Sequence, residues 1–362
     1  MRIMIGGGGT GGHIYPALAL ARYAREADSD NKILFVGSKT GLENKIIPSS
    51  GFKLVTIHAR GFQRSLKQIG AVIGDLFKGL RESGRIIDQF RPDVVLGTGG
   101  YVAAPLVMAA LMKKYPTVIH EQNALPGLTN RRLARYVSMV CISYAETKSR
   151  LPRSSHIVLT GNPRASEVGV ISREEGCRQF GLDPAAKMVL IYGGSRGALK
   201  LNREVIAYLK AGFLPQEISL IYVTGEIYHR EVLGELGSLP ERVKLFPYLE
   251  EMPAALAAAD LAVTRSGATT LAEITAIGLP AILIPSPNVV SNHQYYNARV
   301  LADAGAAVLI EEKDFDCLKL KKEIDILVNN PEILTDMSKR SSELGLTDAA
   351  EKIYQCLREV AS

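Results

Sequence analysis

The segment from Gly6 to His13 reads GGGGTGGH, follows an apolar run at residues 2–5 and precedes apolar residues at helical spacing. This pattern indicates a turn between a strand and a helix. Glycine tolerates positive φ angles and has no Cβ to keep an oxygen-rich ligand away, and the first helical turn adds unpaired N–H groups and a positive dipole end. We therefore expect an anion, or a developing negative charge, to bind beside His13, the only side chain in the loop that titrates near neutral pH.

A second glycine turn follows the same pattern later in the chain. Residues 189–192 form an apolar run, Gly193–Ala198 reads GGSRGA, and residues 199–209 have helical spacing. For either turn alone, a tight connection without a ligand is an alternative interpretation. The repetition of strand, glycine turn and helix favours two related nucleotide-binding folds.

A third turn of this type carries a carboxylate. Arg265–Glu273, with the sequence RSGATTLAE, follows an apolar run and opens a helix, so its glycine and hydroxyls can hold a pyrophosphate at the helix N-terminus. Glu273 lies one turn further in, where a carboxylate can accept hydrogen bonds from both hydroxyls of a ribose. The alternative is that Glu273 only complements the helix dipole. The amides of Asn292 and Gln294 can bind sugar hydroxyls, and Arg164 can reach a diphosphate.

Two polar clusters in the first half also stand at the ends of apolar runs. They are Gly97–Tyr101, with the sequence GTGGY, and His120–Asn123, with the sequence HEQN. The carboxyl ends of parallel strands lie along one edge of a sheet, where ligands collect. We therefore expect both clusters to face the same cleft as the first glycine loop.

Alternating strands and helices must position these turns, and the chain has that alternation throughout. Strands are predicted at residues 3–5, 33–36, 54–57, 94–96, 117–119, 139–142, 156–159, 189–192, 220–223, 243–246, 261–264, 281–284 and 307–310. Helices are predicted at residues 14–27, 42–50, 66–90, 103–114, 128–136, 199–209, 269–277, 293–304, 332–343 and 348–360. This rhythm is typical of doubly wound parallel sheets.

The polar, rigid segment Gly161–Arg164 interrupts the alternation and is interpreted as a linker between domains. The predicted fold is α/β, with two Rossmann-like doubly wound domains facing a cleft. The predicted divisions are residues 1–163, residues 164–340, and a C-terminal helix within residues 341–362 that returns to the N-terminal domain.

The bulk properties are those of a globular protein of about two domains. The chain has 362 residues and a mean hydropathy of +0.08. No apolar run reaches the roughly 18 residues that span a bilayer, and no signal peptide is recognisable, so a cytoplasmic location is expected. The four cysteines are widely spaced without a CxxC pair, which favours buried thiols over a disulfide framework or metal site: Cys141, Cys177, Cys317 and Cys356.

Charge is distributed unevenly between the two halves. Residues 1–163 contain 22 Lys and Arg against 10 Asp and Glu, a net +12, whereas residues 164–362 contain 21 against 27, a net −6. A basic N-terminal half suits an anionic surface, either lipid headgroups or nucleic acid. Because no nucleic-acid-binding module is recognisable, a membrane is favoured and nucleic acid is not expected as a partner.

An apolar stripe at helical spacing lies within residues 66–85 and has basic flanks. The apolar members are Leu66, Ile69, Ile73, Leu76, Phe77 and Leu80, and the flanks are Arg60, Arg64, Lys67, Lys78, Arg81 and Arg85. One interpretation is an ordinary core contact. The other, favoured by the basic flanks, is an interfacial helix that sits on an anionic membrane leaflet.

Taken together, the motifs resemble one family, the two-domain B-type nucleotide-sugar glycosyltransferases, and within it the bacterial peptidoglycan N-acetylglucosaminyltransferases. The resemblance covers nearly the whole chain. It rests on Gly8–His13, Gly97–Tyr101, His120–Asn123 with Gly127–Asn130, Gly161–Arg164, Gly193–Ala198, Ser266–Glu273 and His293–Gln294. It implies transfer of GlcNAc from UDP-GlcNAc to the C4 hydroxyl of MurNAc in lipid I, giving lipid II and UDP in peptidoglycan synthesis. It also implies a peripheral location on the cytoplasmic face of the cell membrane, with other cell-wall synthesis proteins as further partners.

The resemblance also implies roles for individual residues. The C-terminal domain would bind the donor through Arg164, Ser195, Leu249, Ala268, Thr269, Thr270, Glu273 and Gln294. Among these, Ser195 and Arg164 would touch the diphosphate, the backbone at Leu249 the uracil, and Glu273 the ribose. The N-terminal domain would bind the lipid-linked acceptor through Thr10, Gly11, Gly12, Gly99, Gly100 and Tyr101, with Asn123 near the GlcNAc. The chain departs from the family pattern at Leu249, where isoleucine is common, and in the loop 286–291, which leaves details of the donor pocket open.

The reaction needs a group that removes the proton of the acceptor hydroxyl while the bond from C1 to UDP breaks. His13 is the predicted base, with Glu121 or His120 as orienting or substitute groups. The alternative is that His13 only caps the helix or contacts substrate. Helix N-termini and Arg164 can stabilise the departing UDP, so we expect inversion at C1 with neither a metal nor a cofactor.

Two DxD sequences resemble a glycosyltransferase metal motif, but their positions argue against that role. Asp28–Asp30 falls between a helix and a strand, on the amino edge of the sheet, and is interpreted as a solvated turn. Asp314–Asp316 is interpreted as a helix N-cap.

Three other functions are alternatives to this one. A UDP-GlcNAc 2-epimerase on the same fold would be indifferent to lipid acceptors. A non-catalytic nucleotide-sugar sensor or scaffold would keep Ser195 and Glu273 but would not need His13. An NAD dehydrogenase is disfavoured because Gly8–His13 lacks the G-x-G-x-x-G register and no acid closes the second strand after Val36.

Overall fold

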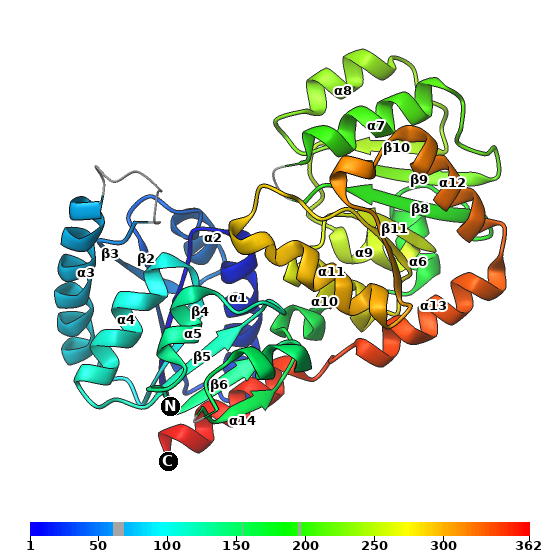
Figure 1. Cartoon of the computed structure of the whole chain (residues 1–362). Coiled ribbons are helices and arrows are strands. Elements are labelled where there is room, and N and C mark those ends of the chain that lie inside the picture. Colours follow the sequence, from blue (N-terminus) through cyan, green and yellow to red (C-terminus); the bar gives the residue numbers. More distant parts are fainter. Residues whose placement is uncertain (61–68, 154, 195–196) are drawn as a thin grey trace. The chain divides into compact units, whose positions relative to one another are not determined.

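The computed structural model describes residues 1–60, 69–153, 155–194 and 197–362, with the backbone alone for 69–73. These residues form two compact units. Unit 1 is Met1–Ser166 together with Thr347–Ser362, and unit 2 is Glu167–Leu346. Each unit is a parallel sheet with helices packed on it (Figure 1).

Unit 1 has a seven-stranded sheet in the order β3-β2-β1-β4-β5-β6-β7, with every neighbouring pair parallel. The strands are β1 (Arg2–Gly7), β2 (Lys32–Ser38), β3 (Lys53–Ile57), β4 (Val94–Gly99), β5 (Thr117–Glu121), β6 (Met139–Ile142) and β7 (Ile157–Leu159). The chain runs outward from β1 to β3, then returns to the other side of β1 with β4. Ligands of such sheets bind at the carboxyl ends of the strands where the order reverses, which is between β1 and β4.

The helices of unit 1 cover this sheet. They are α1 (Gly11–Ala27), α2 (Glu43–Ser49), α3 (Ile69–Phe90), α4 (Gly100–Met112), α5 (Leu128–Leu133) and α14 (Ala349–Ala361), with short 3-10 helices η2 (Ala145–Arg150) and η3 (Pro163–Glu167). α3 packs against α4. The strands are continuous apolar runs because both sheet faces are covered, as Ile5, Val95 and Ile119 illustrate with no exposed surface.

α14 is the last helix of the chain, yet it belongs to the unit formed by the first residues. It packs against α1, where the rings of Tyr23 and Tyr354 meet edge to face at 5.9 Å. Asn31 donates to the Tyr354 hydroxyl at 2.9 Å. Ile353 and Leu357 are fully buried in the same apolar cluster as β1 and α1.

Unit 2 has a six-stranded parallel sheet in the order β10-β9-β8-β11-β12-β13. The strands are β8 (Lys187–Tyr192), β9 (Ile218–Val223), β10 (Val243–Phe246), β11 (Leu261–Thr264), β12 (Ala281–Leu283) and β13 (Ala307–Leu309). Its strand order reverses between β8 and β11, so the same rule expects a ligand there.

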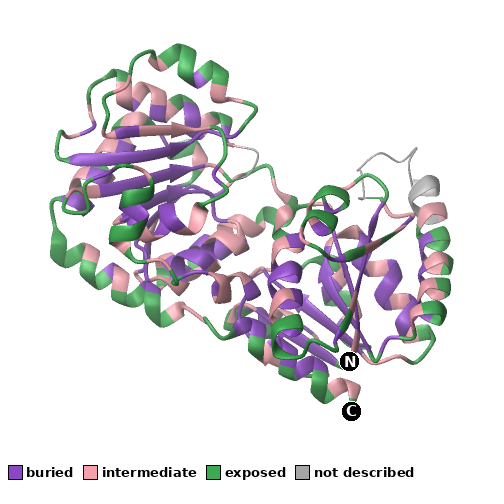
Figure 2. Ribbon diagram, turned by 180° about the vertical axis from the view of Figure 1, so that it is seen from behind, coloured by how far each residue is buried: buried purple, intermediate pink, exposed green. Residues whose placement is uncertain are grey.

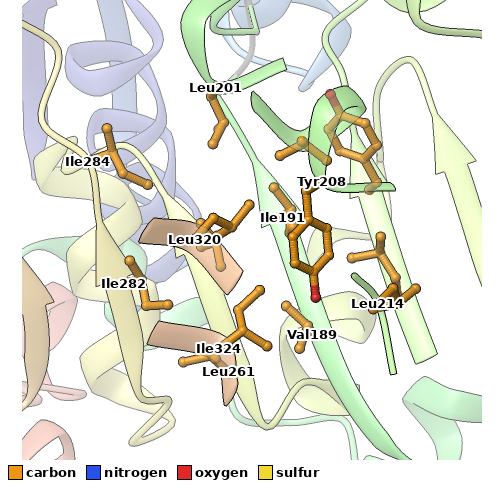
Figure 3. Close-up of a cluster of buried hydrophobic side chains, with 14 of the residues drawn as sticks. Val189, Ile191, Leu201, Tyr208, Leu214, Leu261, Ile282, Ile284, Leu320 and Ile324 are labelled. Carbon is orange, nitrogen blue, oxygen red and sulfur yellow. The ribbon is translucent and has the colours of Figure 1, made fainter. Parts of the chain in front are cut away.

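The helices of unit 2 are α6 (Arg173–Gln179), α7 (Leu199–Lys210), α8 (His229–Leu236), α9 (Met252–Ala258), α10 (Ala268–Ala276), α11 (His293–Asp303), α12 (Cys317–Val328) and α13 (Pro331–Leu344), with 3-10 helices η4 (Val290–Asn292) and η5 (Glu312–Asp314). One core cluster joins strands to helices, with Val189, Leu261 and Ile282 from the sheet and Leu201 and Ile324 from α7 and α12 (Figure 3). Figure 2 shows buried strands in both units and helices with exposed outer faces.

The predicted fold class is confirmed, since both units are doubly wound parallel α/β sheets. Every predicted strand overlaps an observed strand. The two DxD sequences were also interpreted correctly: Asp28 and Asp30 lie in an exposed turn, and Asp316 caps α12 by accepting from the Lys319 amide at 2.7 Å. Within the described part of the chain, no helix is long and apolar enough to cross a membrane.

Candidate active site

His13 lies in the first turn of α1, directly after the glycine loop that follows β1. Its Nδ1 donates to the carbonyl oxygen of Thr98 at 3.0 Å, and the Thr98 hydroxyl donates to the His13 carbonyl oxygen at 3.0 Å. A neutral imidazole that carries its proton on Nδ1 has its lone pair on Nε2. The contact with Thr98 therefore orients the ring and makes Nε2 the basic nitrogen.

The glycine turn between β4 and α4 closes around the same ring. Gly99 and Gly100 have φ angles of +101° and +77°, which favour glycine. A Cβ on Gly99 would lie 2.7 Å from His13 Nδ1, and a Cβ on Gly100 would lie 2.3 Å from the Gly8 carbonyl oxygen. Glycine is thus required at both positions for the two loops to pack together at the β1/β4 reversal.

His120, at the end of β5, is a scaffold residue in this network. It is 1% exposed, and its Nε2 donates to the Gly161 carbonyl oxygen at 2.9 Å. Burial, reinforced by the nearby His13 but opposed by the Gly161 hydrogen bond, lowers the pKa of His120 to about 4. A side chain this buried and this weakly basic is suited to orienting its neighbours rather than to removing a substrate proton at neutral pH.

Glu121 is also engaged by its own loop. One carboxylate oxygen accepts from the Asn123 amide at 3.0 Å and the Asn123 side chain at 3.2 Å, and the other accepts from Gly127 N and Asn130 Nδ2, both at 2.9 Å. These four hydrogen bonds on a 2% exposed residue argue for an orienting role and against a substitute base. Among the three predicted catalytic residues, His13 is the one whose geometry suits a base.

Gln122 is a link that the sequence interpretation missed. Its Nε2 donates to the Thr98 carbonyl oxygen at 2.6 Å and lies 3.2 Å from His120 Nδ1. The amide thereby joins His120 to the carbonyl that orients His13. The HEQN motif was recognised, but the partner of each side chain depends on strands that are far apart in sequence.

In unit 2, the glycine turn Gly193–Ala198 connects β8 to α7. Gly194 and Gly197 have φ angles of +82° and +71°, and a Cβ on Gly193 would lie 2.6 Å from the Ala198 amide nitrogen. The turn is therefore tight and dependent on glycine. Ser195, predicted to touch the diphosphate, lies outside the described residues.

β8 and β11 are neighbouring parallel strands, so the segments that follow them lie at the same edge of the sheet. The start of α10, which follows β11, is therefore close to this turn. Two hydroxyl groups there are buried and, among the described residues, have no hydrogen-bond partner: Ser266 Oγ and Thr269 Oγ1. Leaving such a group buried and unpaired costs about 1–3 kcal/mol. Their concentration at a helix N-terminus indicates a site for an oxygen-rich ligand.

Tyr192 and Glu273 extend this site. Tyr192 ends β8 directly beside Thr264, and its hydroxyl is buried. The sequence predicts Tyr192 only as a strand residue. Burial, together with the negative charge of Glu273, raises the pKa of Tyr192, and a hydrogen bond with the Thr264 side chain only partly opposes this. Glu273 is 7% exposed on α10. A buried carboxylate and hydroxyls beside a helix N-terminus are suited to a phosphorylated sugar.

Arg265 and Gln294 organise the loop that follows β12. Arg265 donates to the Ile284 carbonyl oxygen at 3.0 Å and pairs with Glu312. Gln294, near the start of α11, accepts from the Ser286 amide at 2.9 Å, which leaves its amide nitrogen as the group that can donate to a ligand.

The remaining predicted substrate-binding residues occupy other positions. Leu249 is 7% exposed and follows β10. Arg164 belongs to unit 1, where its guanidinium lies 5.8 Å from the centre of the Tyr15 ring. Thr10, Gly11 and Gly12 form the start of α1, whose first amides have no partner within the helix.

Two family models match most of the chain. The glycosyltransferase family 28 N-terminal domain matches residues 3–142, and the family 28 C-terminal domain matches residues 188–353.

Curated relatives match over the full length. The chain is 45% identical over 366 aligned residues to the UDP-N-acetylglucosamine--N-acetylmuramyl-(pentapeptide) pyrophosphoryl-undecaprenol N-acetylglucosamine transferase of Bacillus pumilus (strain SAFR-032), with 100% of each chain covered. It is 43% identical over 364 residues to the protein of the same name from Bacillus subtilis (strain 168), with 99% of each covered.

Solved structures are also similar to this chain over nearly its full length. Acinetobacter baumannii MurG has a TM-score of 0.79 at 27% identity, with 99% of each chain covered. A Neisseria meningitidis UDP-GlcNAc 2-epimerase, bound to UDP-GlcNAc, has a TM-score of 0.70 at 14% identity, covering 99% of this chain and 100% of that one, which shows a shared fold alone. The family models and the full-length relatives together show that the chain belongs to glycosyltransferase family 28.

Proposed function

We propose that this protein transfers GlcNAc from UDP-GlcNAc to the MurNAc-pentapeptide of an undecaprenyl-pyrophosphoryl acceptor, as part of peptidoglycan synthesis. The observation that carries this proposal is the 41–45% identity, over 98% or more of both chains, to relatives that bear the name of that transferase. The sites at the strand-order reversals of the two sheets support it, because the reaction needs one site for each substrate.

Unit 2 is the proposed donor site. The unpartnered hydroxyl of Thr269 and the N-terminal turn of α10 at Ala268 and Thr270 would hold the diphosphate, with Ser195 and Arg164 as further contacts. Glu273 would bind the ribose and Gln294 the sugar, while the backbone at Leu249 would meet the uracil. The buried hydroxyls support this assignment because a phosphate supplies the partners they lack.

Unit 1 is the proposed acceptor site. The amides at Thr10–Gly12 and the turn at Gly99–Tyr101 would bind the acceptor pyrophosphate at the N-termini of α1 and α4. Asn123, on the loop after β5, would contact the GlcNAc that is being transferred.

His13 is the proposed general base. Its Nε2 would take the proton of the acceptor C4 hydroxyl as that oxygen attacks C1 and the bond from C1 to UDP breaks, which inverts the configuration at C1. A positioned base contributes roughly 10²- to 10⁴-fold to a rate. The N-termini of α7 and α10 would stabilise the charge that develops on UDP without a metal.

Exposed apolar side chains in unit 1 support a membrane-facing surface. On α3, Leu76 is 36% exposed and Phe77 is 67% exposed, and Lys78 lies beside them. We propose that this part of α3, within residues 66–85, contacts an anionic inner leaflet, so that the acceptor's lipid chain stays in the bilayer. Leu66 lies outside the described residues.

Radiolabelled UDP-GlcNAc and a lipid-linked acceptor analogue test the proposal. We expect transfer that persists in EDTA and falls about 10²- to 10⁴-fold in His13→Ala, with UDP binding retained. An Asp28→Asn variant serves as the control and should keep wild-type turnover, because Asp28 lies in an exposed turn. Loss of transfer in EDTA would remove the metal-free mechanism, and full activity of His13→Ala would remove the assignment of the base.

A further inference from the structure

Glu43, the first residue of α2, carries a carboxylate that is completely buried in unit 1. Among the described residues it forms no ion pair, so its charge is compensated by hydrogen bonds instead. One oxygen accepts from the Ser38 amide at 2.8 Å and the Ser38 hydroxyl at 2.7 Å, and the other accepts from the Gly9 amide at 3.0 Å. The carboxylate thus ties the end of β2 to the glycine loop that follows β1.

Glycines surround this carboxylate closely. A Cβ on Gly8 would lie 2.5 Å from a Glu43 oxygen, one on Gly41 would lie 2.0 Å from a Glu43 oxygen, and one on Gly37 would lie 2.7 Å from its Cγ. Side chains at these positions would displace Glu43. Part of the glycine content of the first loop is therefore explained by an internal carboxylate rather than by an external ligand.

The fixed segment continues to His13. Gly9 has a φ angle of +86°, and its neighbour Gly8 presents a carbonyl oxygen against Gly100, whose turn encloses the imidazole ring. The amide of His13 in turn donates to the Thr10 carbonyl oxygen at 3.1 Å. A displacement of Gly8 and Gly9 would therefore move the start of α1 and the ring that it carries.

We propose that Glu43 is a positioning residue for the transfer reaction, acting as the internal anion of the first glycine loop and holding that loop so that His13 meets the acceptor hydroxyl. The proposal rests on the proposed role of His13. In nucleotide-binding folds, amides of this loop face a phosphate. In this chain the Gly9 amide is already satisfied by Glu43, so the amides at the start of α1 are the ones available to a substrate anion.

The carboxylate suits this role because it stays ionised. Burial by itself raises its pKa, but the hydrogen bonds from the Ser38 side chain and from the amides of Gly9 and Ser38 outweigh burial, so the pKa of Glu43 lies below its ordinary value. A glutamine cannot replace it. Only one of the two terminal groups of glutamine is an oxygen, and its NH₂ group cannot accept the hydrogen bonds that Ser38 or Gly9 donates to Glu43.

The test combines kinetics with histidine NMR on Glu43→Gln. We expect kcat to fall about 10- to 100-fold, as for a small misplacement of a catalytic group, with the KM for UDP-GlcNAc within about twofold of wild type. In protein labelled with ¹³C at histidine, the resonance assigned to His13 by its loss in His13→Ala should shift, while those of His229 and His293 in unit 2 should not. Glu26→Gln, an exposed glutamate on α1, is the matched control and should behave as wild type in both measurements.

A kcat within twofold of wild type, or an unmoved His13 resonance, overturns the proposal. If Glu43→Gln does not fold, Glu43→Asp carries the same expectations, because it keeps the charge but shortens the side chain by one methylene. Failure of the proposed base would show separately, as full turnover in His13→Ala, and the NMR measurement would still report whether Glu43 positions the ring.

Discussion

His13 and His120 belong to one hydrogen-bond network, through Thr98 and Gln122, but their surroundings differ. His13 is partly exposed in the first turn of α1, whereas His120 is buried and donates to a backbone carbonyl. Burial favours the neutral form of an imidazole. The same residue type therefore serves as a candidate base at one position and as a rigid support at the other.

This difference predicts a pH-dependent contribution of His120 to stability. The pKa of His120 is about 4 in the folded chain, below the ordinary value of 6.5, so only the unfolded chain takes up the proton between these values. The contribution of His120 to the free energy of unfolding is fully present above pH 6.5 and is lost as the pH falls toward 4. The total loss is on the order of 3 kcal/mol. His120→Gln, which can still donate to Gly161, should flatten that part of the curve measured by urea unfolding.

The exposed His156 supplies the control for this measurement. His156→Gln should keep the wild-type dependence on pH, because the His156 side chain is exposed to solvent in the folded chain. An unchanged slope in His120→Gln would show that His120 is not held neutral by the fold.

At the scale of elements, apolar runs located the strands, because the central strands of both sheets are covered on both faces. Hydrophobic periodicity did not give residue ranges for α6, α8, α9 or α12, which lie in unit 2 and were expected only as helices between strands. The site was predicted as motifs at strand ends. Its connections were not, because Glu43 to Gly9 and Gln122 to Thr98 join residues brought together only by the pairing of distant strands.

Glu43 shows the limit of local patterns in particular. It stands in the first turn of a seven-residue helix, where an acidic side chain ordinarily complements the helix dipole in solvent. Nothing in the local sequence indicates that it points inward. Likewise, Tyr192 ends an apolar strand, and only the register of β8 with β11 brings it beside Thr264.

The exposed apolar side chains of α3 predict how strongly the protein binds anionic membranes. Leu76→Asp with Phe77→Asp should lower binding to anionic vesicles at least about tenfold in a flotation assay, because each apolar side chain contributes roughly 1.5–3 kcal/mol when buried and the added charges repel the surface. Val170→Asp with Val290→Asp makes the same charge change at residues of unit 2 that are 85% and 82% exposed, and should bind as wild type. Equal binding by both double variants would contradict the role of α3.

At the scale of the whole molecule, unit 1 is discontinuous in sequence. Residues 167–346 form unit 2, and the chain then contributes Thr347–Ser362 to the first unit. The match to the family 28 C-terminal domain ends at residue 353, inside α14. That helix nevertheless packs on α1, in unit 1. We therefore expect the folding of unit 1 to depend on the last residues of the chain.

Leu357 tests this dependence. It is fully buried in the cluster formed by β1, α1 and α14, so Leu357→Ala should destabilise unit 1 by about 2–5 kcal/mol through lost burial and a cavity. In calorimetry the unfolding of unit 1 should move to lower temperature, while the transition that UDP raises, assigned to unit 2, should stay in place. Ile333→Ala, on α13 of unit 2 and 42% exposed, should change stability by no more than about 0.5 kcal/mol. If Leu357→Ala instead lowered only the temperature of the UDP-sensitive transition, α14 would stabilise unit 2 rather than the core of unit 1.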